Sequence, residues 1–462
     1  MPHHWIPNSS YDIRKKMLEY VGVKDVLDFF NDVPEKLILK EPLKVGYGRP
    51  LTEYEVKRVF NNVISKNKLP PIPSFIGGGV CHHYVPSVVK AILSRSEFYT
   101  AYTPYQPEIA QGLLQAFFEY QSVMAELYGV DIVNASMYNG STAAAEAVLM
   151  SSRVTKRKKV LISKAVHPEV RDVIKTWCFG AGLEVIEVNY DVSTGETDLK
   201  DFESKLSNDV AASLIQSPNF FGVIETKMRR FIDVTHNAGA LAIVYSNPIA
   251  LGVFEAPGAL GADIVVGDTQ ALGNGLNYGG PSAGVLGIKE DKELLRQLPG
   301  RLIGMTKTVD GVEKGYMMIL QTREQHIRRE RATSNITTNS ALEAVASVVY
   351  IALLGAEGLR RLGEAILGRT EYLIRRLRSV KDIVAPLFAN GLYFREVSFK
   401  VVGKDLSEVL KKLASEGIYV GPQLSRFYEE LPNCSLACVT EVHTLEDIDT
   451  LVSKLSEVLG GG

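Results

Sequence analysis

The chain has 462 residues, which is longer than one small domain and suits a large domain with a smaller one. Hydrophobic residues make up 46% and charged residues 23% of the sequence, so a core of normal size can form. Lys and Arg total 51 against 53 for Asp and Glu, and this net charge of −2 does not favour nucleic acid or an anionic membrane as a partner.

The sequence predicts a protein of the reducing cytoplasm. Four cysteines in a chain of this length do not indicate a disulfide framework. The N-terminal sequence MPHHWIPNSS lacks the charged and apolar regions of a secretion signal. We also find no uninterrupted apolar stretch of bilayer-spanning length, and we therefore expect no membrane partner.

The N-terminal part of the chain has polar, helical patterns. These patterns cover 11–20 and 52–64, and Thr52 and Glu55 have the spacing of a capping box. Prolines in the stretch 70–73 then end the helical pattern. We expect this part to form an arm that precedes the main domain.

From residue 108 the sequence alternates between helical patterns and short apolar runs. A first helix begins near Ile109, where apolar residues recur at steps of three or four. The expected strands are 132–137, 159–162, 183–188, 211–216, 241–245, 263–267 and 283–288, and the expected helices include 141–152, 168–180 and one that ends over 231–238. Repeated alternation of this kind favours an α/β fold with a mainly parallel, helix-covered sheet.

The pattern changes after residue 335, where we expect a smaller α+β C-terminal domain. A long helical block covers 340–379, with a break predicted near 355–363. Shorter strands and helices follow at 392–401, 405–416, 418–420, 435–439 and 445–459. The expected domains are a helical arm over 1–75, a large α/β domain over 76–335 and a small α+β domain over 336–462.

Three stretches of sequence are specific enough to indicate a family. Residues 100–112 read TAYTPYQPEIAQG, residues 138–147 read YNGSTAAAEA, and residues 322–337 read TREQHIRRERATSNIT. Together they resemble the P-protein of the glycine cleavage system, and the resemblance covers nearly the whole chain. It implies the fold of aspartate-aminotransferase-like, fold-type I enzymes that use pyridoxal phosphate (PLP).

The resemblance also implies a function. In many bacteria and archaea the P-protein is split into two homologous subunits, and this chain is similar to subunit 1. With subunit 2 it would decarboxylate glycine through PLP and transfer the aminomethyl group to the lipoyl arm of H-protein. The subunits would form a heterodimer and then an α2β2 heterotetramer. Two alternatives are a self-sufficient PLP-dependent lyase or transferase and a purely structural or regulatory pseudoenzyme subunit.

A PLP pocket in this fold needs a phosphate site, a ring that stacks on the pyridine, a carboxylate for the pyridinium nitrogen and a Schiff-base lysine. Ser141 and Thr142 open an Ala-rich helix whose free N–H groups suit a phosphate, although either residue could simply cap the helix. The resemblance places His167 where a histidine stacks on the pyridine. The alternative for His167 is an ordinary loop or core histidine.

The other two requirements are not met by the sequence. Asn247 stands where cofactor-binding relatives have an aspartate, and a neutral amide cannot hold the pyridinium proton as an ion pair. Counting back from the turn at 279–281, Gln270 takes the position of the lysine, and an amide nitrogen is not a useful nucleophile toward an aldehyde. No lysine occurs between Lys227 and Lys289.

We therefore expect a vestigial pocket on this chain, with no catalytic residue and no covalently bound cofactor. PLP is expected on subunit 2 instead. The residues of the vestigial pocket are Ser141, Thr142, His167, Asn247 and Gln270.

Other residues are candidates for a site shared with the partner subunit. Tyr102, Tyr105 and Gln106 could position glycine or exclude water there, or they could be ordinary interface packing. Arg323 leads a basic cluster that could bind a carboxylate or phosphate, or could pair with neighbouring glutamates or with the partner. The other members of the cluster are Arg328, Arg329 and Arg331.

We expect no metal site. His82 and His83 are adjacent, so they point to different faces of regular structure, and the sequence shows no acidic partner nearby. Cys434 and Cys438 are close in sequence but lack a further thiol cluster.

Overall fold

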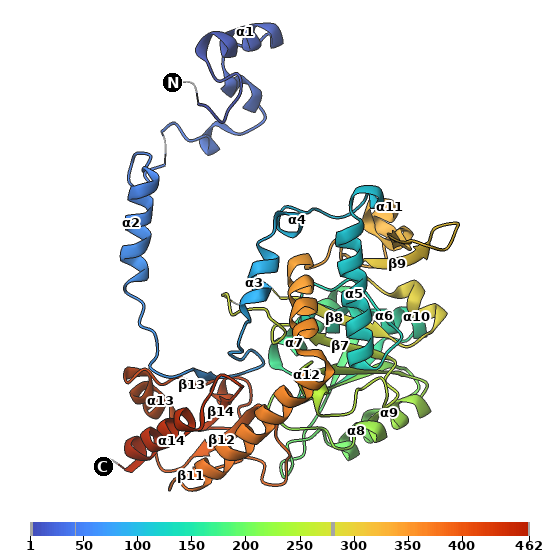
Figure 1. The fold of residues 1–462 in the computed structure, drawn as a ribbon, viewed down its shortest axis with the longest axis vertical. Coiled ribbons are helices and arrows are strands. Elements are labelled where there is room, and N and C mark those ends of the chain that lie inside the picture. The colour runs from blue at the N-terminus through green and yellow to red at the C-terminus, as the bar shows by residue number, and fades with distance from the viewer. Residues whose placement is uncertain (1–2, 42, 279–281, 461–462) are drawn as a thin grey trace. The chain divides into compact units, whose positions relative to one another are not determined.

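The computed structural model describes residues 3–41, 43–278 and 282–460. The chain divides into two compact units, Met1–Lys68 and Leu69–Gly462. The first unit is helical, and the second contains the β-sheets of the described residues (Figure 1).

The first unit contains the helices α1 (Tyr11–Val21) and α2 (Glu53–Ile64). The Thr52 hydroxyl accepts a hydrogen bond from the Glu55 N–H at 3.3 Å, and the Glu55 carboxylate accepts one from the Thr52 N–H at 2.9 Å. The predicted capping box is thereby confirmed. No residue of α1 or α2 is buried, so these helices form no core of their own.

A seven-stranded sheet lies at the centre of the second unit, in the order β2-β8-β7-β6-β5-β3-β4. Its strands are β2 (Ile132–Val133), β3 (Lys159–Ser163), β4 (Glu184–Val188), β5 (Val210–Ser217), β6 (Leu241–Ser246), β7 (Ile264–Asp268) and β8 (Gly284–Ile288). The strands are parallel except β8, which is antiparallel to both of its neighbours. The predicted mainly parallel sheet is confirmed, although β2 ends earlier than expected.

Helices cover both faces of this sheet because its strands are apolar on both sides. In β3, Leu161 packs into one core cluster, while Val160 and Ile162 pack into another on the opposite face. Burial of each such side chain contributes about 1.5–3 kcal/mol. The covering helices are α5 (Gln111–Tyr128), α6 (Gly140–Thr155), α7 (Pro168–Ala181), α8 (Leu199–Lys205), α9 (Met228–Asn237) and α10 (Lys292–Gln297).

The long helix α12 (Ala341–Arg378) follows the large sheet. Its residue Gly355 has a non-helical backbone with φ 62° and ψ −177°, which confirms the predicted break. By length and composition alone α12 could also cross a membrane. Instead, Ala344, Ala346 and Tyr350 are buried in the same core cluster as residues of α5 and the central sheet. Packing inside the protein therefore accounts for part of the apolar character of α12, whose most apolar 18-residue window is 33% buried.

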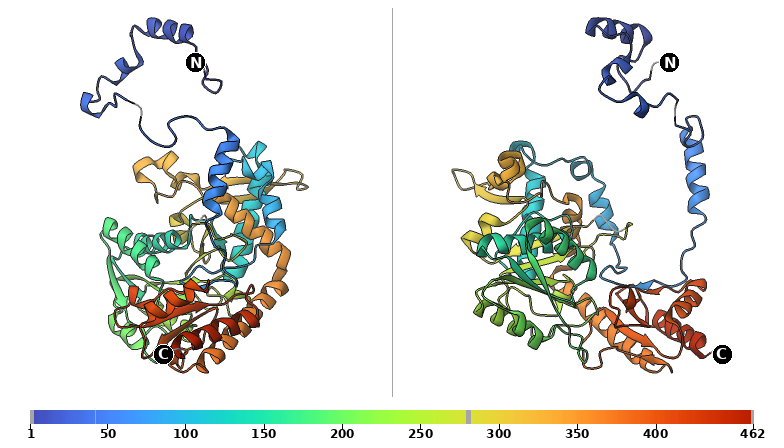
Figure 2. Two further views of the ribbon diagram at one scale, coloured as in Figure 1. Left: turned by 90° about the vertical axis from the view of Figure 1, so that its left-hand side faces the viewer. Right: turned by 180° about the vertical axis from the view of Figure 1, so that it is seen from behind.

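The C-terminal elements lie beside the central sheet (Figure 2), and they share a core cluster with residues next to that sheet, such as Phe220 and Phe221. Three antiparallel strands, in the order β11-β12-β14, pack with two helices. These elements are β11 (Ile383–Val384), β12 (Glu396–Val401), β14 (Cys434–Cys438), α13 (Leu406–Ser415) and α14 (Leu445–Gly460). They match the predicted α+β region, while the domain boundaries at 75 and 335 stay predictions.

Several short elements were not predicted. One of them is the strand β1 (Phe75–Ile76), which pairs with β13 (Val420–Gly421), next to the short element expected at 418–420. This pairing brings the segment after the prolines to the C-terminal elements. The strands β9 (Leu302–Lys307) and β10 (Lys314–Ile319) form a hairpin. The remaining short helices include α3 (Ser87–Leu93), α4 (Ser96–Tyr99), η3 (Pro107–Ile109), η4 (Ala250–Gly252), η5 (Gln321–Arg323) and α11 (Gln325–Arg328).

Candidate functional site

A cavity of about 450 Å³ lies at the carboxyl ends of the central parallel strands. Residues that follow β3, β5, β6 and β7 line it together with the start of α6. This edge of an α/β sheet is the usual place for a ligand site. Of the predicted pocket residues, the cavity wall includes Ser141, His167, Asn247 and Gln270 but not Thr142.

The start of α6 already has oxygen partners for its N–H groups. Asn139 is the N-cap, and its side-chain oxygen accepts from the Thr142 N–H at 2.9 Å. The alternative in which Ser141 or Thr142 caps the helix is therefore wrong. One carboxylate oxygen of Asp268 accepts from the Gly140 N–H at 2.9 Å. An anionic group of the chain itself thus lies at the helix N-terminus.

Asp268 is held in this position by several donors. Its other carboxylate oxygen accepts from the Gln270 N–H at 2.9 Å and from the Ser282 hydroxyl. A phosphate at the start of α6 would bring a second anion to the N–H groups that Asp268 uses, and the two charges would repel. The predicted phosphate site is therefore taken by an internal carboxylate. Sequence analysis missed Asp268 because β7 and α6 are far apart in the chain.

The two amides of the predicted pocket bind within the chain. Gln270 donates from its amide nitrogen to the Asn274 carbonyl at 3.1 Å. The side-chain oxygen of Asn247 accepts from the Ile249 N–H at 3.0 Å and from the Ala250 N–H at 3.3 Å. It therefore supports the turn into η4. The turn at 279–281, from which Gln270 was aligned, lies outside the described residues.

These residues do not fit PLP. A Schiff base needs an amine, and the described pocket wall offers the Gln270 amide at the predicted position. The pyridinium nitrogen needs a carboxylate, and Asn247 is neutral. The phosphate needs free N–H donors, and Asp268 occupies part of that set. The vestigial pocket stays a prediction, which the chemistry of these residues supports.

His167 is fixed by two hydrogen bonds. Its Nδ1 accepts from the Glu169 N–H at 3.2 Å, so its Nε2 carries the proton and donates to the Gly78 carbonyl at 2.6 Å. A Cβ at Gly79, where φ is +92°, would lie only 2.7 Å from the His167 ring. His167 therefore lines the pocket as predicted, with the Gly77–Gly79 loop pressed against it.

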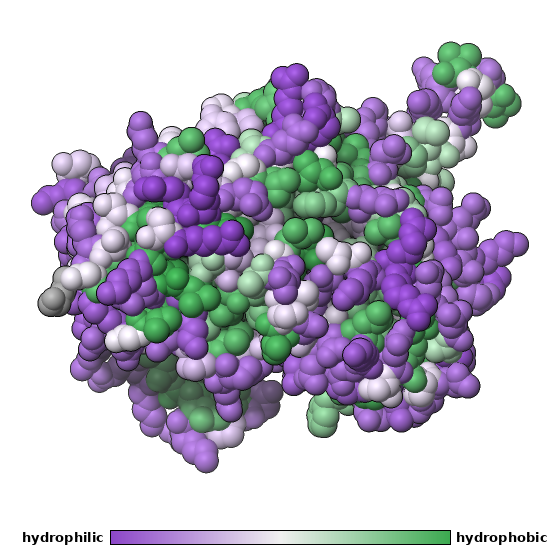
Figure 3. Space-filling model, turned by 90° about the horizontal axis from the view of Figure 1, so that it is seen from below, coloured by the Kyte–Doolittle hydropathy of each residue, from purple (hydrophilic) through white to green (hydrophobic). Residues whose placement is uncertain are grey.

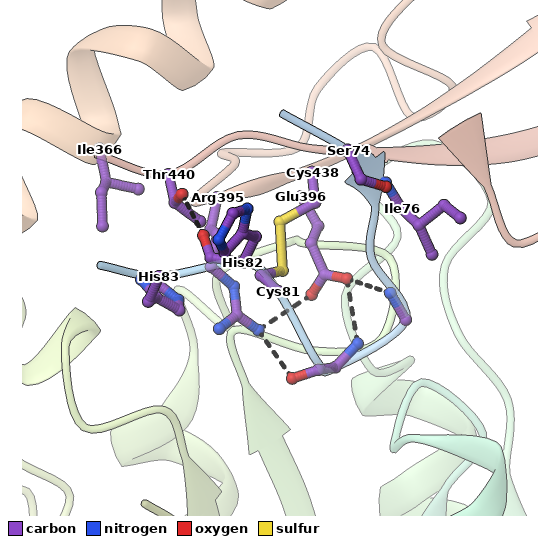
Figure 4. Close-up of a disulfide and its surroundings, with 12 residues drawn as sticks. Ser74, Ile76, Cys81, His82, His83, Ile366, Arg395, Glu396, Cys438 and Thr440 are labelled. Atoms are coloured by element: carbon purple, nitrogen blue, oxygen red, sulfur yellow. Dashed lines mark hydrogen bonds and ion pairs between the residues drawn. A yellow bond between two sulfur atoms is a disulfide. The ribbon is translucent and has the colours of Figure 1, made fainter. Parts of the chain in front are cut away.

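The same glycine loop is tied to the C-terminal elements (Figure 4). The Glu396 carboxylate accepts from the N–H groups of Gly78 and Gly79 at 2.5 and 3.1 Å. A disulfide joins Cys81 to Cys438. The sequence had indicated only that the four cysteines form no disulfide framework, and this single disulfide was not predicted. Sequence gave no signal for it, because the two residues are separated by 357 positions.

The histidine pair also differs from expectation. His83 is buried, and its Nδ1 lies 2.9 Å from a carboxylate oxygen of Glu441. The sequence-based statement that no acidic partner is near was therefore wrong, since Glu441 comes from a distant part of the chain. Burial lowers the pKa of His83. Among the described residues no group of three potential metal ligands was found.

The first and third motif stretches meet around Arg301. This arginine is 2% exposed, and its guanidinium lies 3.1 Å from a Glu324 oxygen and 3.2 Å from the Tyr105 hydroxyl. The guanidinium carbon also lies 5.2 Å from the centre of the Tyr105 ring, and the His326 ring is 5.6 Å from that centre. Arg301 thus links the motifs, although sequence analysis did not single it out.

The predicted shared-site residues differ in exposure. Tyr102 is 82% exposed and Tyr105 44% exposed, and Gln106 is also exposed. Arg323 is instead buried and donates to the Leu320 and Gly300 carbonyls at 3.0 and 3.1 Å. Burial lowers the pKa of Arg323. Arg323 therefore holds its own loop, while the other three candidates reach the surface.

Large apolar side chains are exposed in the segment around Tyr102. Apolar residues also reach the surface on other parts of the protein, as the green areas between purple ones in Figure 3 show, and a single exposed apolar residue is ordinary. Near the first motif the exposed fractions are 71% for Tyr99, 82% for Tyr102 and 83% for Ile109. Large exposed side chains gathered in one segment indicate a contact surface.

Comparisons with known proteins agree with these features. The family profile described as glycine cleavage system P-protein matches residues 3–455. A protein of Saccharolobus islandicus named probable glycine dehydrogenase (decarboxylating) subunit 1 is 46% identical over 99% of this chain and 98% of its own length. A protein of Staphylothermus marinus with the same name is also 46% identical, with the same coverage.

Solved structures show the same relationship. A glycine decarboxylase (P-protein) of the glycine cleavage system, in inhibitor-bound form, has a TM-score of 0.87 and 40% identity, with 99% of each chain covered. A NifS-like protein has a TM-score of 0.62 at 13% identity, over 85% of this chain and 100% of its own, and shares the fold alone. The chain therefore has the fold of type I PLP-dependent enzymes and belongs to the glycine cleavage system P-protein family.

Proposed function

We propose that this chain is subunit 1 of a glycine dehydrogenase (decarboxylating), active in a complex with subunit 2. Near-full-length identity of 46% to proteins of that name carries the proposal. In the complex, PLP supplies the chemistry of glycine decarboxylation, and the aminomethyl group passes to the lipoyl arm of H-protein. The setting is the cytoplasm.

Subunit 2, rather than this chain, binds the cofactor. The pocket of this chain offers an amide at Gln270 and a carboxylate, Asp268, beside the start of α6. Both features oppose PLP, the first because it lacks a nucleophilic amine and the second because it repels phosphate. No reaction step is therefore assigned to the pocket of this chain.

This chain contributes a wall of the site on its partner. Tyr102, Tyr105 and Gln106 are exposed and lie on the segment where large apolar side chains gather. The buried Arg301 guanidinium holds the Tyr105 phenol by a hydrogen bond of 3.2 Å. A positioned phenol on a contact surface can orient a small substrate and exclude water when the partner docks. The assembly is an α2β2 heterotetramer.

A glycine–bicarbonate exchange assay tests the proposal. The isolated chain should show no exchange and no visible aldimine absorption when PLP is added. Exchange should appear when subunit 2 and lipoylated H-protein are combined with it, and subunit 2 with H-protein alone should be much slower. Exchange by the isolated chain, with borohydride trapping of PLP on one of its lysines, would contradict the proposed division of roles.

A further inference from the structure

The pocket that does not fit PLP contains a buried arginine. Arg395 lines the cavity immediately before β12, and its side chain is only 7% exposed. A buried guanidinium needs partners for its charge and its donors. The proposed interface does not use Arg395, so the strength of its contacts within the chain decides whether its role is purely structural.

Those partners are weak. One terminal nitrogen, Nη2, lies 3.3 Å from the Gly79 carbonyl and 3.2 Å from a Glu396 oxygen (Figure 4). Both distances are long for a charged donor, which usually lies about 2.7–2.9 Å from a carboxylate. The Glu396 carboxylate is also shared with two N–H groups of the glycine loop. The other terminal nitrogen, Nη1, has no hydrogen-bond partner within the described residues.

The backbone at Arg395 is held in an uncommon conformation. Its φ is 70°, in the left-handed region that favours glycine. The Arg395 N–H donates to the buried Thr370 hydroxyl at 2.9 Å, which fixes this conformation. Strained non-glycine residues concentrate where a side chain must be aimed at a ligand.

Two other residues that line the same cavity, Gln270 and Asp268, carry groups complementary to a guanidinium and to N–H donors. The side-chain oxygen of Gln270 is buried and lacks a donor among the described residues. The Asp268 carboxylate lies nearby and gives this wall a negative charge. Tyr245 lies within range of both charges. Burial raises the pKa of its phenol most, Asp268 raises it further, and Arg395 lowers it. The cavity thus has an unmatched donor and an unmatched acceptor.

We propose that this cavity binds a compact carboxylate that also carries N–H donors, the class of small amino acids. The ligand carboxylate would bind the Arg395 guanidinium, and its N–H donors would face Gln270. The cavity of about 450 Å³ has room for such a molecule. This second site lies on the chain that does not carry the cofactor, and it is separate from the catalytic site proposed on subunit 2.

Titration of the full-length chain alone tests the site, because subunit 2 is then absent. Glycine, acetate and acetamide are added at constant ionic strength, and binding is followed by ligand-observed NMR and calorimetry. Glycine and acetate should bind saturably with Kd on the order of millimolar. Acetamide, which has the shape of acetate without its charge, should bind at least tenfold more weakly.

Arg395→Gln should weaken glycine and acetate binding at least tenfold, and Arg395→Lys should do so less. Arg229→Gln is the matched control, because Arg229 is an exposed arginine of α9. Absence of saturable binding to the wild-type chain, equal binding of acetamide, or unchanged binding by a folded Arg395→Gln variant would each overturn the proposal. If that variant does not fold, the comparison of glycine, acetate and acetamide on the wild-type chain still tests the site. Glycine–bicarbonate exchange by the assembled complex tests the proposed function and is measured separately. Loss of exchange is therefore distinguishable from loss of binding at this cavity.

Discussion

The cavity and the surface around Tyr105 use polar side chains in opposite ways. In the cavity, Asp268, Asn247 and His167 each bind backbone N–H groups of the chain itself. At the surface, Arg301 is buried and pairs with Glu324 and the Tyr105 hydroxyl, but the tyrosine that it supports is left exposed. Groups that a cofactor would need are thus bound within the chain, whereas groups that a partner would meet point outward. This contrast supports the docking role proposed for this chain.

The largest expected effect comes from removal of Arg301, the buried arginine that contacts the exposed Tyr105. Arg301→Ala leaves the Glu324 carboxylate buried without its cation, and it also removes the donor to the Tyr105 hydroxyl. The free energy of unfolding should fall by roughly 3–5 kcal/mol, as for other broken buried ion pairs. Denaturant unfolding of the full chain measures this change.

The matched control is Arg331→Ala, whose 3.8 Å pair with Glu330 is 86% and 77% exposed. That variant should change stability by less than about 0.5 kcal/mol, because exposed pairs contribute little. Equal stability of the Arg301 and Arg331 variants would show that the Arg301 cluster does not support the surface.

Glu225, a buried carboxyl outside the cavity, should make the stability of the chain depend on pH. Burial raises the pKa of Glu225 to about 7 from an ordinary value of 4.5, despite hydrogen bonds from Thr197 and Asn219 that lower it. The folded state therefore keeps a proton that the unfolded state has lost between these two values. Stability from Glu225 is complete below pH 4.5 and is lost as the pH rises through 7, with a total change of roughly 3 kcal/mol.

Comparison with Glu225→Gln isolates this contribution. The comparison is needed because burial lowers the pKa of His443 to about 4 from 6.5, so its contribution has the opposite sign and is lost as the pH falls from 6.5 through 4. Urea unfolding at pH 5 and pH 7.5 should show that the stability of the wild type falls by roughly 2 kcal/mol relative to that of the variant, because the contribution of His443 is common to both proteins and cancels. A parallel pH dependence in both proteins would mean that Glu225 is ionised in the fold.

The next prediction separates the contribution of Tyr105 to docking from its contribution to folding. Tyr105→Ala should weaken assembly with subunit 2 by about 2 kcal/mol, as expected for an aromatic anchor at an interface, and should lower exchange by the complex. Stability of the isolated chain should change less, because the ring is 44% exposed. Affinity from sedimentation, set beside turnover at saturating subunit 2, distinguishes loss of docking from loss of substrate positioning. Full affinity and full turnover would remove Tyr105 from the shared site.

Sequence predicted the parts of this molecule that depend on local pattern. The apolar strands from β3 to β8 and the break in α12 were predicted to within a few residues, because each depends on the pattern of a short stretch of consecutive residues. The hairpin of β9 and β10 was missed, since much of it is exposed and carries little apolar periodicity. Pocket residues that directly follow predicted strands, such as His167 and Asn247, were also found.

What sequence could not provide is the pairing of distant residues. Asp268 reaches Gly140 across 128 positions, and Arg301 reaches Tyr105 across 196. Such contacts depend on the order of strands and on how the hairpin packs, and no local pattern records them. The Arg395 side chain was missed for the same reason, because it enters the cavity from the C-terminal elements.

The smallest predicted effect bears most directly on the contrast between cavity and surface. In Asp268→Asn the helix α6 keeps an oxygen acceptor for the Gly140 N–H, but the negative charge at its N-terminus is gone. Inorganic phosphate should then bind the full-length chain about tenfold more tightly, because the helix N-terminus favours an anion and repulsion is removed. Phosphorus NMR titration measures this change, with Asp291→Asn, an exposed N-cap of α10, as the control for general charge. Unchanged phosphate affinity would mean that Asp268 is not what excludes the cofactor. The absence of a Schiff-base amine at Gln270 would then have to explain the exclusion by itself.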